Sequence, residues 1–191
     1  MRAVVYILLA TFPLLGPSAS EAQETSAQSQ QVESTELKKH ALFLLASRGT
    51  PESARFLRDF YARTKDPELQ KTVVFHIAQS GTDEDIEWLR RTVQDQDAEE
   101  EIRKAALFWL AQNDRTTLAQ LEEMYGNMES RELKEQVLFA YSQKQEPEAV
   151  DRLMAIARGD PDRKLRKTAL FWLAQSRDGR VTQLLVDIIN Q

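Results

Sequence analysis

The sequence of 191 residues contains no cysteine, six glycines and two histidines. Without cysteine the chain can form no disulfide, thiolate metal site, cysteine-linked lipid anchor or catalytic thiol. Six glycines leave little loop for a phosphate cradle, and the H-E-x-x-H, G-x-S-x-G, Walker and G-x-G-x-x-G patterns are missing. His40 and His76 have no fixed carboxylate to complete a metal-ligand set. We therefore expect no metal, no other cofactor and, because no convergent acid/base pair is evident, no enzymatic activity.

A surplus of positive charge is missing as well. The chain has 25 Lys and Arg residues against 30 Asp and Glu residues, for a formal net charge of −5. Phosphate backbones require a concentrated basic surface, so nucleic acid is not an expected partner. The basic residues are interspersed with acidic ones, which also argues against an anionic membrane surface. A protein or peptide is the partner that we expect.

The N-terminal segment has the organisation of a secretory signal. Arg2 precedes the apolar stretch VVYILLATFPLLG, which has the length of a signal h-region. That stretch is shorter than the roughly 20 apolar residues that span a bilayer. The small residues Ser20 and Ala22 favour cleavage before Gln23. We predict a signal peptide over residues 1–22, a periplasmic or secreted protein and no membrane association after cleavage; an uncleaved membrane anchor is the alternative.

A polar segment follows the predicted signal. Residues 23–35, QETSAQSQQVEST, contain one branched apolar residue and no hydrophobic period. Such a composition cannot bury a core, so we predict a disordered polar tether between the signal and the folded domain.

The remainder of the chain repeats itself. LRKTALFWLAQ, at residues 165–175, is nearly a copy of IRKAALFWLAQ at residues 102–112, and weaker copies begin at Leu37, Leu69 and Leu133. The five starts are separated by 32, 33, 31 and 32 residues. A fixed period of this size is typical of solenoids, in which each unit buries its apolar face against its neighbours.

A second amphipathic segment lies between successive copies, with apolar pairs such as Leu57 with Phe60 and Val181 with Leu184. Capping residues precede helix starts at Thr50-Pro51, Asp66-Pro67, Asp160-Pro161, Ser130 and Asp178. No stretch alternates with period two, so no strands are expected. The sequence predicts an all-α, two-layer α-solenoid of about five helical hairpins over residues 36–191.

The repeated segment resembles the HEAT-repeat family, in particular the bacterial HEAT-like (phycobilisome-lyase-type) repeat, whose second helix reads V-R-x-x-A-x-x-A-L-G-x. The resemblance implies an α-solenoid used as a binding surface. A few members of the family are bilin lyases or DNA-repair glycosylases, so a lyase-type enzyme using the groove stays an alternative. The matching residues are Ile102, Arg103, Ala106, Trp109, Leu110 and Ala111.

A phenylalanine recurs on the face opposite the predicted core. With Phe108 at zero and about 100° per residue, Ile102 and Leu110 fall near 120° and 200°. HEAT-like repeats usually carry a variable, often charged residue at the phenylalanine position, and their second helices line the concave side of the solenoid. A glutamine follows the ring by four residues in four copies. We predict a concave protein-binding ladder made of Phe43, Phe75, Phe108, Phe139, Phe171, Gln79, Gln112, Gln143 and Gln175.

Two other interpretations compete with this exported binding scaffold. The rings can be half-buried spacers covered by lysine stems, and Trp109 and Trp172, one position after a ring, are read as packing against the adjacent repeat. The C-terminal helix, GRVTQLLVDIINQ, has a wide apolar stripe. It suggests an end-to-end self-associating structural module, with a homodimer formed through that helix.

Overall fold

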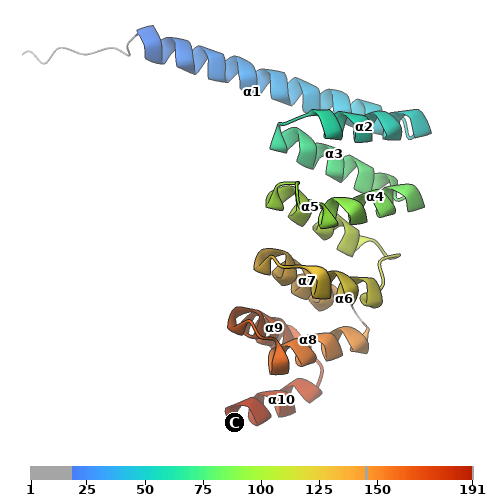
Figure 1. The fold of residues 1–191 in the computed structure, drawn as a ribbon, viewed down its shortest axis with the longest axis vertical. Helices are drawn as coiled ribbons and strands as arrows, with labels where there is room; N and C mark the ends of the chain where they lie inside the picture. The colour runs from blue at the N-terminus through green and yellow to red at the C-terminus, as the bar shows by residue number, and fades with distance from the viewer. Residues whose placement is uncertain (1–18, 145, 191) are drawn as a thin grey trace, which may run out of the picture. The chain divides into compact units, whose positions relative to one another are not determined.

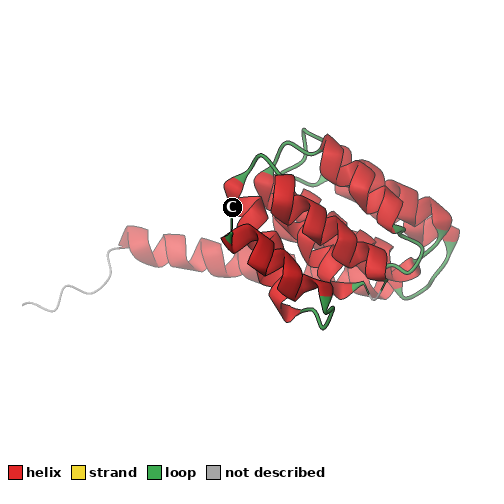
Figure 2. Cartoon of the chain, turned by 90° about the horizontal axis from the view of Figure 1, so that it is seen from below, coloured by secondary structure: helices red, strands yellow, loops and turns green. Residues whose placement is uncertain are grey.

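The computed structural model of the chain describes residues 19–144 and 146–190. These residues form ten helices and no strand (Figure 1, Figure 2). The all-α prediction is therefore confirmed. The chain divides into two compact units, Met1–His40 and Ala41–Gln191.

The first unit contains most of helix α1 (Ala19–Ala46), whose last six residues belong to the second unit. Residues 23–35 are thus helical where the sequence suggested a disordered tether. The physical reason is their composition: glutamine and glutamate have good helix propensity, and neither proline nor glycine interrupts the segment. Most of the predicted signal peptide, residues 1–18, lies outside the described residues. Within the described part of the chain, no helix is long and apolar enough to cross a membrane.

The second unit is a two-layer array. The repeated segments form α3, α5, α7 and α9, which pack side by side in chain order, and each also contacts at least one helix of the other layer (Figure 1). α10 packs on α8, within that other layer. The helices that follow α1 are α2 (Pro51–Arg63), α3 (Pro67–Ser80), α4 (Asp83–Gln94), α5 (Glu100–Gln112), α6 (Leu118–Asn127), α7 (Arg131–Gln143), α8 (Pro147–Gly159), α9 (Arg163–Gln175) and α10 (Arg180–Ile189).

The core follows the predicted face of each repeated helix. The first apolar position of the repeat is at most 2% exposed in α3, α5, α7 and α9, as Ile102 in α5 illustrates. The fifth position, which is Ala106 in α5, is fully buried in the same four helices. Leu37, the counterpart in the first copy, belongs to the first unit and is exposed. Burial of these small and branched side chains brings the two layers together and leaves the opposite face of each repeated helix uncovered.

The helix starts confirm three of the predicted caps and correct two. Thr50, Asp66 and Ser130 are N-caps whose side chains accept backbone N–H bonds. Asp160 is not a cap, because its carboxylate accepts bonds from the Tyr125 hydroxyl and from a backbone N–H two residues further on.

Helices α9 and α10 therefore begin later in the chain than the predicted caps indicated. α9 begins at Arg163, with Asp162 as its N-cap. α10 begins at Arg180 after Gly179, although Asp178 accepts a bond from the Arg180 N–H.

Candidate functional site

The five predicted phenylalanines lie on the uncovered face of the repeated helices. Phe43, Phe75 and Phe171 are 51%, 38% and 59% exposed. Phe108 and Phe139, in the middle of the array, are half-buried. The unrolled helix predicted this outward direction.

Most of the rings are in contact through the aromatic residue that follows Phe75, Phe108 or Phe171. His76 lies between Phe43 and Phe75, with ring centroids 6.0 and 5.1 Å away. Trp109 lies 5.1 Å from Phe75 and 4.9 Å from Phe108. These separations fall within the range in which aromatic rings attract.

The same contacts continue through the second half of the array. Phe108 stacks directly on Phe139, with centroids 6.4 Å apart and ring planes 9° from parallel. Trp172 then lies 5.4 Å from Phe139 and 4.9 Å from Phe171. We call this continuous set the aromatic strip; its members are Phe43, His76, Phe75, Trp109, Phe108, Phe139, Trp172 and Phe171.

Sequence reasoning did not include the histidine and the tryptophans in the ladder. The tryptophans were expected on the flank that meets the adjacent repeat, and they lie there. His76 occupies the same position of its helix, and each of the three rings lies against the phenylalanine of the preceding repeated helix. The counterpart in α7 is Ala140, which is buried and carries no ring. Phe108 and Phe139 stack directly because no side chain intervenes. An aromatic residue one position after the phenylalanine is therefore the feature of the sequence that indicates which rings join the ladder.

Burial affects two members of the strip. His76 is buried, and its burial lowers the pKa of the imidazole below its ordinary value. The indole Nε1 of Trp172 is buried and has no hydrogen-bond acceptor among the described residues. The ring is therefore held in place by packing.

The four predicted glutamines border the strip on the C-terminal side of each helix. All four are exposed. Gln143 donates a bond from Nε2 to the Ser142 hydroxyl at 3.1 Å. In the described part of the chain the other three amides make no side-chain hydrogen bond, so their donors and acceptors are open to solvent. These three are Gln79, Gln112 and Gln175.

Charged side chains border the strip on the N-terminal side. In α3, Lys71 pairs with Glu68, and in α5 Lys104 pairs with Glu101 at 2.6 Å. The Lys104 ammonium lowers the pKa of the Glu101 carboxyl. In α7 the lysine position is occupied by Glu135.

Two hollows lie beside Trp172. One, of about 280 Å³, is on the glutamine side and includes Gln143 and Gln175. The other, of about 400 Å³, is on the charged side and has Phe139 and Trp172 among its walls. The strip is therefore not a flat surface at this point but has room for side chains on both flanks.

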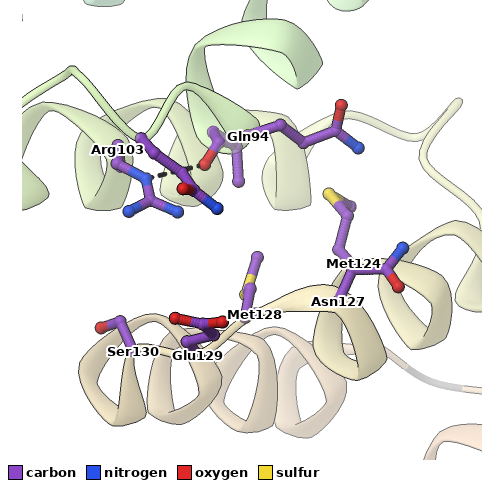
Figure 3. Close-up of a pocket in the computed structure, with 9 residues that line it drawn as sticks. Gln94, Arg103, Met124, Asn127, Met128, Glu129 and Ser130 are labelled. Atoms are coloured by element: carbon purple, nitrogen blue, oxygen red, sulfur yellow. Dashed lines mark hydrogen bonds between the residues drawn. The ribbon is translucent and has the colours of Figure 1, made fainter.

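A different hollow, of about 460 Å³, lies at the edge where α4 and α6, helices of the first layer, connect to the repeated helices α5 and α7 (Figure 3). Arg103 and Gln94 reach it from one side, and Met128 and Glu129 lie on the other (Figure 3). The Arg103 Nε donates a bond to the Val93 carbonyl at 2.9 Å. A gap of about 500 Å³ recurs one repeat later and shares only Glu129 with the first hollow, so we interpret both as spaces between successive loops.

A buried carboxylate lies in α4, toward the N-terminal end of the array. Asp85 accepts bonds from Arg58 and from the Thr82 hydroxyl, each at 2.5 Å, and from the Ser80 hydroxyl. Both oxygens are satisfied within the protein, which indicates a structural role. No group of three or more metal-ligating side chains occurs among the residues that the structure describes.

Residues 27–111 match the family model for HEAT repeats. Over this stretch the chain is similar to HEAT repeats. The match covers most of α1 and continues through Ala111 in α5, and the same period continues to α9. The match names HEAT repeats without a subtype, so the phycobilisome-lyase-type resemblance stays a prediction. No curated protein matches the chain.

HEAT repeats commonly mediate protein–protein interactions, and the proteins built from them are typically scaffolds without catalytic activity. A protein partner is the coarse functional conclusion that the family supports.

Proposed function

We propose that this protein is an exported scaffold that binds a peptide, or an extended segment of a partner protein, along the aromatic strip. The observation that carries the proposal is the unbroken series of ring contacts from Phe43 to Phe171, on the face of the repeated helices that the other layer leaves uncovered. Contiguous exposed apolar patches mark interaction sites, and buried aromatic side chains dominate binding energies. The strip is taken to lie on the concave side, as in other HEAT arrays.

The two kinds of side chain on this face suit an extended chain. Apolar side chains of the bound segment would pack on the rings, while main-chain N–H and C=O groups would meet the open glutamine amides. A glutamine amide can both donate and accept, so it can pair with either main-chain group. We propose that the protein performs no chemical step on the bound segment.

The proposal is tested by replacing the central rings. A variant with Phe75, Phe108 and Phe139 changed to Ser should lose the partner that the wild-type protein captures from a periplasmic extract. The physical reason is loss of the apolar surface that the partner covers. Circular dichroism should report unchanged helicity, because the three side chains lie outside the core.

A matched control is available on the other layer. Phe56 in α2 is 47% exposed and lies outside the strip, so Phe56→Ser should leave capture unchanged. Should the triple variant lose helicity, the outermost rings give a second test, with Phe43 and Phe171 changed to Ser. A partner retained equally by both folded strip variants would show that the strip is not the binding surface.

Export is a separate part of the proposal. We expect the mature protein to begin at Gln23, because Ser20 and Ala22 suit the peptidase that removes secretory signals. N-terminal sequencing of the protein recovered from the periplasm or the medium checks this. Recovery of the chain with its first 22 residues intact, in the membrane fraction, would support the anchor instead.

Self-association is a second candidate, favoured by α10. Val186 and Ile189 of this helix are 44% and 81% exposed, whereas Val181 and Leu184 are buried. The mass in solution should then rise with concentration, and changing Val186 and Ile189 to Ser should abolish that rise. A constant monomer mass at high concentration would exclude this candidate.

A further inference from the structure

The charge pattern beside the strip reverses in α7. In α3 and α5 the residue four before the phenylalanine is a lysine that pairs with a glutamate on its own helix. α7 has Glu135 at the lysine position and Glu132 at the glutamate position. Neither carboxylate forms an ion pair in the part of the chain that the structure describes; Glu132 accepts one long bond, at 3.4 Å, from the Ser130 hydroxyl.

The two carboxylates share a hollow with two rings of the strip. The hollow has a volume of about 400 Å³, and Phe139 and Trp172 in its wall have centroids 5.4 Å apart. Lys104 also reaches it, but its ammonium already pairs with Glu101 at 2.6 Å. Two carboxylates beside aromatic faces are the combination that attracts an organic cation, through charge-assisted hydrogen bonds and through the ring quadrupoles.

The reversed charges of α7 would have a structural role if they formed ion pairs with α9, where Lys164 and Lys167 occupy the corresponding positions. The described structure contains no ion pair between these lysines and Glu132 or Glu135, and both lysines are exposed to solvent. Lys104 lies near Glu132 and Arg131 near both carboxylates, but each cation is already bound to another carboxylate, Glu101 and Asp162 respectively. The charged residues that line the hollow are Glu132, Glu135 and Lys104, so its lining has a net negative charge.

We propose that this hollow binds a lysine or arginine side chain of the segment that lies on the aromatic strip. The inference rests on the proposed function and adds the chemical class of the partner: an extended segment with apolar residues and one cationic residue placed over α7. Glu135 is the residue that selects for the cation, since it replaces the lysine present in the other four copies.

Selection from a displayed library of short random peptides tests this, with the full chain as bait. Peptides selected on the wild-type protein should be enriched in Lys or Arg at one position among apolar residues. The variant Glu135→Lys, which restores the residue of the other copies, should select peptides without that enrichment. Helicity should be the same in both proteins, because Glu135 lies at the surface edge of the strip.

Binding measurements with one selected peptide complete the test. Glu135→Gln should weaken binding roughly tenfold, in the range of one charge-assisted hydrogen bond, because the rings and their cation–π contact are unchanged. Replacing the peptide's cationic residue by norleucine should weaken binding similarly and make it insensitive to Glu135→Gln. Glu123→Gln, a change to an exposed carboxylate of α6 outside the strip, should leave the affinity unchanged.

The outcomes separate the two proposals. Peptides that require Phe108 and Phe139 but show no cationic preference would overturn the inference and leave the proposed function standing. An affinity unchanged by Glu135→Gln would do the same. A library that yields no peptide dependent on the strip would overturn both.

Discussion

Asp85 is a buried carboxylate in α4 that forms an ion pair with Arg58 of α2. It is buried and receives bonds from Arg58, Ser80 and Thr82. Asp85→Ala would leave a largely buried guanidinium with a single exposed partner, Glu84, at 2.7 Å. We expect the free energy of unfolding, measured by urea denaturation, to fall by about 3 kcal/mol.

The neighbouring acid provides the control for that prediction. Glu84 binds the same guanidinium but is exposed, so Glu84→Ala should cost less than about 1 kcal/mol. Equal losses for the two variants would show that burial of the Asp85 carboxylate carries no special cost.

His76 should make the stability of the array depend on pH. Burial lowers the pKa of its imidazole in the folded protein below the ordinary value of 6.5. The unfolded chain therefore binds a proton first as the pH falls. The stability contributed by neutral His76 is present above pH 6.5 and is lost as the pH falls through the folded pKa.

His76→Leu removes this titration. Between about pH 5 and 7, where carboxylates stay ionised, the unfolding free energy of the variant should change less with pH than that of the wild type. Chemical denaturation at several pH values in that interval measures the two slopes. Identical slopes would show that His76 binds its proton equally well in the folded and unfolded chains.

At the scale of the element, the residue after the repeat start closes the turn that precedes the helix in α3, α5 and α9. Arg103 donates to the Val93 carbonyl at 2.9 Å and Arg166 to the Asp160 carbonyl at 2.6 Å. Gln70 does the same with the Thr64 carbonyl at 3.2 Å. These bonds satisfy carbonyls at the end of the preceding helix that have no partner within that helix.

Helix α5 begins without a side-chain cap. Its N-cap is Glu99, whose side chain accepts no backbone bond, whereas Thr117 caps α6 with a reciprocal pair of bonds to Gln120. Glu99→Asp keeps the charge and supplies a side chain short enough to accept a bond from the first turn. We expect it to raise the free energy of unfolding by about 0.5–1 kcal/mol, measured by urea denaturation.

Removal of the existing cap of α6 gives a reference value for the free energy that a cap contributes. Thr117→Ala should lower the free energy of unfolding by about 1 kcal/mol, because it removes the cap that Glu99→Asp is meant to create. A Glu99→Asp variant no more stable than the wild type would show that the turn before α5 does not admit the capping geometry.

At the scale of the whole molecule, a repeat array loses stability unevenly. Leu107 in α5 and Leu184 in α10 are both buried, but α10 packs on the first-layer helix α8 at one end of the array. Each repeat contacts its neighbours alone, so a defect at the end is local. Leu184→Ala should speed amide hydrogen exchange in α10 while the amides of α5 exchange as in the wild type.

A central defect should behave differently. Leu107→Ala should cost about 2–5 kcal/mol and speed exchange in the helices on both sides of α5. Hydrogen exchange resolved by helix distinguishes the two variants. Uniform acceleration along the chain in Leu184→Ala would indicate that the array unfolds as one cooperative unit.

The repeat period and the helical wheel predicted most of the fold. In α3, α5, α7 and α9 the first and fifth positions of the repeat, such as Ile102 and Ala106, are buried because helical periodicity alone decides which side chains face the other layer. The start of α9 was misplaced because two carboxylates, Asp160 and Asp162, lie within reach of it, and the start of α10 because Gly179 takes the N-cap position after Asp178. The polar segment before the array was misjudged because absence of a hydrophobic period was given more weight than helix propensity.

The sequence by itself determined that the chain is an array of helical hairpins and that its phenylalanines point away from the core, because both follow from local spacing. The tertiary structure decided that the rings touch, that His76 and the two tryptophans join them, and that Asp85 is enclosed by three donors. These contacts link residues about one repeat apart or lie where two helices meet. They depend on how neighbouring helices are spaced and rotated, which no single segment encodes.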